Sequence, residues 1–125
     1  MAAKKKVQLP VSDRQLKDLA QSFKLLSDDS RLKILLALTR EGEMHVTSLC
    51  DLLGESQPAV SHHLTLLRMQ GLVSFRRTGK FNNYHLDAVN FGNLLEDVFG
   101  LAGKGNKMDF GEFAVTFSRT GKKKN

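Results

Sequence analysis

The spacing of the apolar residues first changes at Gly71. Before that point apolar side chains recur every three or four residues, which is the spacing of one face of an α-helix. After it they alternate with polar side chains, which is the spacing of a β-strand. A chain of 125 residues has room for one domain with its own core. We therefore predict a mainly α domain in which several helices precede a β-hairpin.

Two helices are predicted in the first third of the chain. Ser12 can cap the first helix, whose apolar side chains recur at helical spacing as far as Leu26. The serine and aspartate side chains of residues 27–30 can start the second helix, and Gly42 ends it. Each helix is therefore expected to bury one face.

A second pair of helices surrounds Gly54. A short helix begins at or beside Thr47 and is ended by Gly54. Ser56 caps the next helix, which carries Pro58 in its first turn, where a missing N–H costs little, and which stops at Gly71. Two helices joined by a tight glycine turn predict a helix-turn-helix.

The residues that follow predict a β-hairpin and a last helix. Alternation at residues 73–77, and again at Tyr84 and Leu86, predicts two strands joined by a basic turn at residues 78–80. Apolar residues then return to helical spacing from about residue 88 to residue 102. The predicted order of elements is α-α-α-α-β-β-α.

The helix that begins at Ser56 has two chemically different sides. Its apolar stripe leaves a polar set facing away from the core. In a helix-turn-helix the second helix enters the major groove of DNA, where Gln can bridge adenine, Ser can pair with several bases, and His can donate to guanine or to a phosphate. An ordinary solvated face would show the same pattern, so periodicity alone leaves both readings open. The stripe is Val60, Leu64 and Leu67, and the polar set is Gln57, Ser61, His62, Thr65 and Arg68.

The charge of the chain is concentrated in places. The formal net charge is +6, and the triplets Lys4–Lys6 and Lys122–Lys124 account for it, because removing these six from the 19 Lys and Arg leaves 13 against 13 Asp and Glu. Residues 56–86 contain no acidic residue. A basic stretch within an otherwise balanced chain indicates a polyanionic partner. Its cations are Arg68, Arg76, Arg77 and Lys80.

Three separated stretches resemble the arsenical-repressor (ArsR/SmtB) family. Residues 56–73, SQPAVSHHLTLLRMQGLV, are similar to the family's recognition-helix segment. Residues 26–35, LSDDSRLKIL, are similar to its helix opening, and residues 76–86, RRTGKFNNYHL, to its wing. The resemblance covers roughly residues 12–102, with the motifs in the family's order and spacing. It implies a winged helix-turn-helix that dimerises through its first and last helices.

The resemblance also implies a function. A protein of this kind would be a dimeric repressor that binds an imperfect inverted repeat in double-stranded DNA. By position, Gln57, Ser61 and His62 would read bases, and Arg77 and Lys80 would contact phosphates or the minor groove. The complete set expected at the DNA is Ser56, Gln57, Ser61, His62, Thr65, Arg68, Val46, Thr47, Arg76, Arg77 and Lys80.

Many members of the family sense metals, but this sequence departs from both of the family's ligand patterns. The cysteine positions beside the short helix hold His45 and Thr47. His45 and Cys50 are five residues apart, which is poor spacing for one helix face. We therefore expect no metal site and no cofactor, and the sequence does not indicate an inducer. The four ligand positions of the last helix hold Ala88, Asn90, Leu101 and Lys104.

Several other polar residues are given a structural or surface role. His62 and His63 stand where the family commonly has histidine, so DNA contact or partial burial is expected for them. His85 alternates with its neighbours in a strand and is expected on the face of the wing. Arg31 and Lys33 are expected on a solvated or phosphate-facing edge.

No enzyme is predicted, because Cys50, Ser61 and the histidines lack the third member of a triad and no glycine-rich loop follows a strand. The alternative function is a winged helix used for protein contact or for non-specific, architectural DNA binding. No signal peptide and no run of about 18 apolar residues occurs. With a single cysteine, the expected location is the cytoplasm, away from membranes.

Three regions are predicted along the chain. Residues 1–11 form a basic tail, residues 12–102 the DNA-binding and dimerisation domain, and residues 103–125 an extension with a basic end. Phe113, Val115 and Phe117 alternate with smaller residues, which predicts a strand within residues 110–118. A bare Phe-rich segment would promote aggregation, so we expect the protein's own dimer to cover it.

Overall fold

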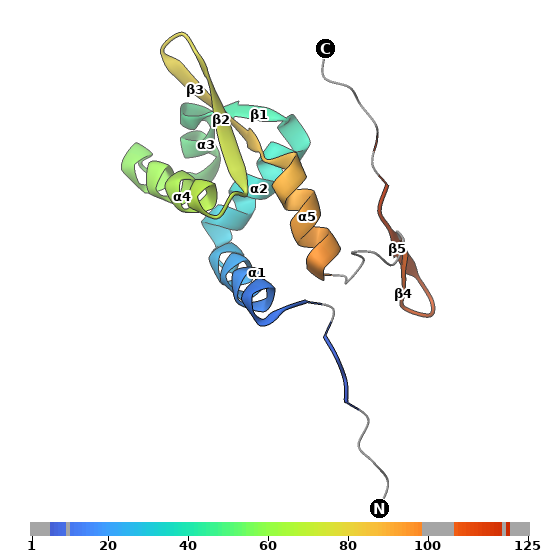
Figure 1. Cartoon of the computed structure of the whole chain (residues 1–125). Coiled ribbons are helices and arrows are strands. Elements are labelled where there is room, and N and C mark those ends of the chain that lie inside the picture. The colour runs from blue at the N-terminus through green and yellow to red at the C-terminus, as the bar shows by residue number, and fades with distance from the viewer. Residues whose placement is uncertain (1–5, 10, 99–106, 119, 121–125) are drawn as a thin grey trace, which may run out of the picture.

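A computed structural model describes residues 6–9, 11–98, 107–118 and 120 (Figure 1). Within that part the chain forms five helices and two small antiparallel sheets. The arrangement is a winged helix-turn-helix, as predicted. The elements are α1 (Asp13–Leu26), α2 (Asp29–Glu41), β1 (Glu43–His45), α3 (Val46–Leu53), α4 (Gln57–Met69), β2 (Val73–Thr78), β3 (Phe81–Leu86), α5 (Ala88–Val98), β4 (Lys107–Asp109) and β5 (Ala114–Thr116).

The first two helices begin at side-chain caps. Ser12 and Gln15 form a capping box, in which the Gln15 backbone N–H donates to the Ser12 hydroxyl over 3.2 Å and the Ser12 N–H donates to the Gln15 amide oxygen over 2.8 Å. Asp28 caps α2 by accepting from the Arg31 N–H over 3.0 Å. These caps satisfy N–H groups that have no partner within the helix.

The two helices of the helix-turn-helix also begin and end at the predicted residues. Gly54 ends α3 with a left-handed φ of 64°, and Ser56 caps α4. Gly71, after α4, also has a positive φ, and a Cβ added there would meet the Asn90 amide at 3.1 Å. The turn into the wing therefore needs glycine for conformation and for space.

The main sheet contains one strand that the sequence did not predict. Its strand order is β1-β3-β2, and the wing hairpin β2–β3 pairs Val73 with Leu86 at its base and Thr78 with Phe81 at its tip. The additional strand, β1, pairs along β3. Three residues are too few to show an alternating pattern, so a strand of this length is identified by its partner.

The core lies between α2, α3, α4 and the base of β2. Its largest fully buried side chains include the predicted stripe of α4, which is Val60, Leu64 and Leu67. Burial of aliphatic surface at about 25 cal/mol per Å² is the main favourable contribution to folding here. This core fixes which side of α4 faces outward.

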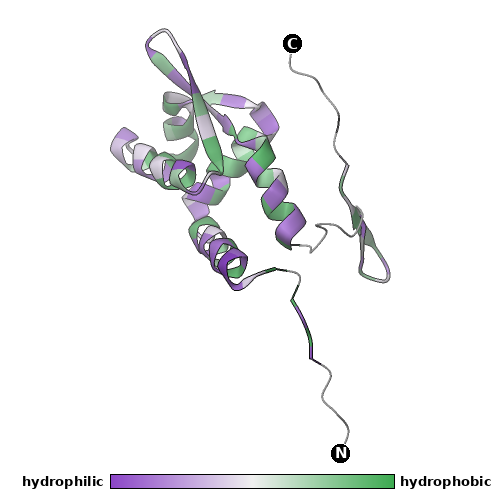
Figure 2. Cartoon of the chain, in the orientation of Figure 1, coloured by the Kyte–Doolittle hydropathy of each residue, from purple (hydrophilic) through white to green (hydrophobic). Residues whose placement is uncertain are grey.

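The apolar faces of α1 and α5 are less buried in the single chain than the sequence predicted. Leu19 is buried, but Leu16 and Phe23 on the same helix are exposed, Phe23 to 52%. No described residue of α5 is fully buried. Figure 2 shows hydrophobic and hydrophilic residues alternating along both helices. Residues 99–102 of the predicted last helix lie outside the described part of the chain.

The C-terminal extension contains a small hairpin of its own. Strands β4 and β5 pair with each other and add nothing to the main sheet. Phe110 and Phe113 stack with ring centres 5.3 Å apart, and Phe113 is 66% exposed. Among the described helices, none combines the length and the apolar character needed to cross a bilayer.

Candidate functional site

The outward side of α4 carries the polar residues expected at DNA. Gln57, His62 and Thr65 are exposed, and Ser61 is half-buried. The Thr65 hydroxyl donates to the backbone oxygen of Ser61 over 2.9 Å, so part of its hydrogen-bonding capacity is used within the helix. The buried stripe and the N-terminal cap of α4 thus leave the three residues expected to read bases, Gln57, Ser61 and His62, on the outward side of the helix.

Two further residues expected near DNA stand at the start of α3, the first helix of the helix-turn-helix. Thr47 is exposed and Val46 is half-buried. His45, which the sequence did not identify as a cap, accepts the Thr47 N–H through Nδ1 over 3.2 Å. The His45 ring also meets Phe81 of the wing edge to face, with ring centres 4.6 Å apart.

The wing arginines differ in what they contact. The Arg76 guanidinium donates to both carboxylate oxygens of Glu43, over 3.1 and 3.2 Å, which ties the hairpin to β1. Arg77 donates to the backbone oxygen of Gly79 and stays exposed, as does Lys80. The tip of the wing therefore presents two cations, while a third is paired with an acidic side chain.

Arg68 also has an internal partner. Its guanidinium carbon lies 4.3 Å from the centre of the Phe75 ring, which belongs to β2. A cation over an aromatic face is attracted by the ring's quadrupole. Arg68 thus links the recognition helix to the wing while its side chain remains exposed.

Comparison with known proteins agrees with this geometry. Residues 28–74 match the family model described as bacterial regulatory protein, arsR family. The cadmium resistance transcriptional regulatory protein CadC homolog of Staphylococcus aureus is 40% identical over 82 residues, which are 66% of this chain and 68% of that protein. The chain belongs to the ArsR family.

Two further matches place this ArsR-family chain among regulators of the same fold. The arsenical resistance operon repressor of Escherichia coli K12 is 48% identical over 66 residues, 53% of this chain and 56% of the repressor. A homodimeric winged helix-turn-helix DNA-binding domain of Mycobacterium bovis, solved in solution, has a TM-score of 0.58 and 29% identity over 83% of this chain and 92% of its own. The ArsR-family protein is a DNA-binding transcriptional regulator and not an enzyme.

Arg31 lies differently from the edge position expected of it. Its backbone belongs to the first turn of α2, and its side chain is partly buried. The Nε group donates to the backbone oxygen of Leu25 at the end of α1 over 2.7 Å, and a terminal nitrogen lies 3.4 Å from Nδ1 of His63. Sequence spacing gave no signal for this, because the partners come from other helices.

His63 is the centre of a polar cluster behind the recognition face. Its side chain is 14% exposed, and its Nε2 lies 3.2 Å from a carboxylate oxygen of Glu55. Glu55 also accepts a hydrogen bond from the Ser30 hydroxyl. That hydrogen bond, together with His63, holds the pKa of Glu55 below its usual range. For Asp28 the N–H of Arg31 is the main cause of a lowered pKa. Of the two neighbouring histidines, His62 is exposed and His63 is partly buried.

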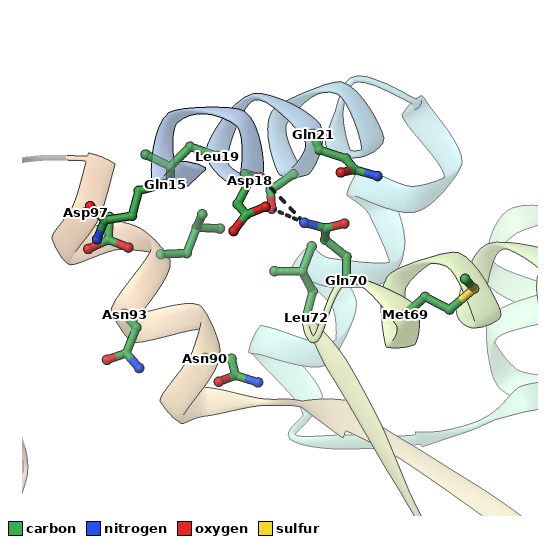
Figure 3. Close-up of a pocket in the computed structure, with 12 residues that line it drawn as sticks. Gln15, Asp18, Leu19, Gln21, Met69, Gln70, Leu72, Asn90, Asn93 and Asp97 are labelled. Atoms are coloured by element: carbon green, nitrogen blue, oxygen red, sulfur yellow. Dashed lines mark hydrogen bonds between the residues drawn. The ribbon is translucent and has the colours of Figure 1, made fainter. Parts of the chain in front are cut away.

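A polar hollow of about 510 Å³ separates α1, the end of α4 and α5 (Figure 3). Gln70 crosses it from α4 and donates to the Ser22 hydroxyl of α1 over 2.9 Å. Ser22 is 4% exposed, so this hydrogen bond satisfies a buried polar group. The C-terminal end of α4 is thereby attached to α1.

Within the described part of the chain, no three His, Cys, Asp or Glu side chains gather to hold a metal ion. Of the family's ligand positions, His45 serves as the cap of α3, and Asn90 hydrogen-bonds to Asp87. Leu101 and Lys104 lie outside the described residues. Cys50 is a free, half-buried thiol.

Proposed function

We propose that this ArsR-family protein represses transcription by binding an imperfect inverted repeat as a homodimer. The observation that carries the proposal is the outward side of α4, where Gln57, Ser61 and His62 stand in the first two turns and outside the fully buried stripe. The N-terminal turns of a recognition helix are those that reach base edges in the major groove. Side chains of these types can hydrogen-bond to bases.

The dimer would form through α1 and α5. Both helices carry apolar side chains that remain exposed in the single chain, such as Leu16 and Phe23 of α1 and Val89 of α5, and such surface is favourably buried against a second copy. The related Mycobacterium bovis domain is homodimeric. A two-fold dimer places its recognition helices about one turn of DNA apart, which requires an inverted repeat.

Within the complex the four cations of the recognition helix and the wing would contact the DNA backbone or the minor groove. Arg77 and Lys80 at the tip of the wing would neutralise phosphates or enter the minor groove. The other residues expected at the DNA belong to the helix-turn-helix and would lie beside the base-reading residues. They are Ser56, Val46, Thr47 and Thr65. Arg76 would reach a phosphate after parting from Glu43, and Arg68 while stacked on Phe75.

The test is selection of DNA from a random pool, followed by titration of the selected and scrambled duplexes. Gln57→Ala and Ser61→Ala should each cost about 1–3 kcal/mol on the selected duplex and much less on the scrambled one. Arg77→Ala and Lys80→Ala should weaken both equally and lower the salt slope by about one each. Equal affinity of the wild type for both duplexes would instead identify a non-specific architectural binder, and no binding to either a module for protein contact.

A further inference from the structure

We propose that His63 is a positioning residue, which fixes the rotation of α4 about its own axis so that Gln57 and Ser61 meet the bases. His63 itself does not touch DNA. The inference rests on the proposed base reading by α4. It assigns a role to the cluster behind that helix, formed by Asp28, Ser30, Arg31, Glu55 and His63.

The hydrogen bonds of the cluster favour the tautomer of His63 that carries its proton on Nε2. Arginine offers donors and no acceptor, so a hydrogen bond over the 3.4 Å between Arg31 and Nδ1 of His63 has Nδ1 as its acceptor. The proton of the neutral ring is then on Nε2, which donates to Glu55 over 3.2 Å. The hydrogen bonds then run in one direction, with Arg31 donating to His63 and His63 donating to Glu55. The Ser30 hydroxyl also donates to Glu55.

The cluster connects four parts of the chain that are separate in sequence. Arg31 belongs to α2 and also holds the last turn of α1 through the Leu25 carbonyl. Glu55 belongs to the turn between α3 and α4, and His63 to the middle of α4. His63 is therefore the residue of α4 through which this cluster holds the recognition helix.

The apolar core sets which side of α4 faces outward, and the hydrogen bonds of the cluster set the finer rotation of the helix within that packing. The buried stripe of α4 is held by the hydrophobic effect, which is not directional. Successive residues of a helix point about 100° apart, so a small rotation would move Gln57 and Ser61 away from their bases. Hydrogen bonds are directional, and those to charged groups are the stronger kind. The Gln70–Ser22 hydrogen bond holds the far end of the same helix in a similar way.

The experiment measures the ratio of affinities for the selected and scrambled duplexes, together with thermal unfolding, in the full-length protein. His63→Leu should lower the ratio about tenfold, as expected when hydrogen bonds to charged partners are lost. His63→Gln keeps an N–H for Glu55 and should recover part of the ratio.

His85→Gln is the matched control, because His85 lies on β3 and its Nδ1 contacts only the neighbouring Leu86 carbonyl among the contacts described. This variant should keep the wild-type ratio. The proposal is overturned if His63→Leu melts at a lower temperature but keeps the wild-type ratio, which would mean a purely structural role. It is also overturned if His63→Gln lowers the ratio as far as His63→Leu does, because an N–H for Glu55 would then not position the helix. A wild type without preference for the selected duplex would contradict the proposed function itself.

Discussion

The guanidinium of Arg68 lies over the ring of Phe75, 4.3 Å from its centre, and joins the recognition helix to the wing. At an exposed site such a contact contributes about 0.5–1 kcal/mol. We expect Arg68→Ala and Phe75→Leu to show a coupling energy of that size in a double-mutant cycle of chemical unfolding. Additive effects of the two substitutions would mean that the stacking contributes nothing.

Glu43 should restrain the affinity of the wing for DNA. It pairs with Arg76 at 3.1 Å in an exposed position, so the pair itself adds little to stability, about 1 kcal/mol or less. Glu43→Gln removes a negative charge and releases Arg76 for a phosphate. Binding to any duplex should strengthen, because Arg76 no longer has to part from a carboxylate before it reaches its phosphate. Glu41→Gln is the control, since Glu41 also is exposed but makes no described contact with Arg76, and it should strengthen binding less. An equal gain in both variants would point to net charge alone.

The acid sensitivity of folding should depend on Asp28 and Glu55. Both carboxyls have a pKa lowered by folding, from usual values of 3.8 and 4.5. Their contribution to stability is therefore present above those values and is lost as the pH falls through the lowered pKa of the folded protein. Asp28→Asn keeps a good helix cap but removes the charge, so its free energy of unfolding should fall less between pH 5 and pH 2, as followed by circular dichroism.

Two comparisons sharpen the measurement at low pH. Glu55→Gln should flatten the acid limb in the same direction, because it removes the other carboxyl of the cluster. Asp29→Asn changes an exposed neighbour and should reproduce the wild-type curve. The assignment fails if all three variants follow the wild type.

Metal ions should not release the protein from its DNA. Thr47 occupies one of the family's cysteine positions, and Ala88 and Asn90 occupy two of its positions on the last helix. Stoichiometric zinc, cadmium or arsenite should therefore leave the affinity for the selected duplex unchanged in a fluorescence titration. Release by any of the three would contradict this expectation and direct attention first to Cys50 and His45.

The C-terminal hairpin should contribute to stability in the dimer. Stacked Phe110 and Phe113 present apolar surface, which a second copy can cover with a gain in free energy. Deletion of residues 108–125 should lower the melting temperature measured by calorimetry. Deletion of residues 119–125 removes the terminal lysines but keeps both strands, and should melt like the full chain. If the longer deletion also melts and binds DNA like the full chain, the hairpin is dispensable.

The local fold of this protein could be predicted from its sequence. Helix caps and glycine turns affect only the backbone within a few residues, so the helix starts and ends that they cause can be recognised in the sequence. The caps are Ser12 and Ser56, and the glycines are Gly54 and Gly71. The stripe Val60, Leu64 and Leu67 has a helical period, which determined the outward side of α4 as well as the buried one.

The polar contacts between elements were decided by tertiary structure. The sequence places Arg31 on a solvated or phosphate-facing edge, yet its partners Leu25 and His63 lie six and 32 residues away. Glu43 meets Arg76 only because β1 pairs beside the wing. Such contacts depend on how elements pack, and no periodicity encodes them.

What the sequence determined by itself was the set of helices and the wing hairpin, because backbone conformation and amphipathic spacing are local properties, whereas β1 became a strand only by pairing with β3. What the tertiary structure decided was the partner of each charged side chain. Hydrophobic packing placed α4, and two directional hydrogen bonds, from His63 to Glu55 in the preceding turn and from Gln70 to Ser22 of α1, then held it in one orientation.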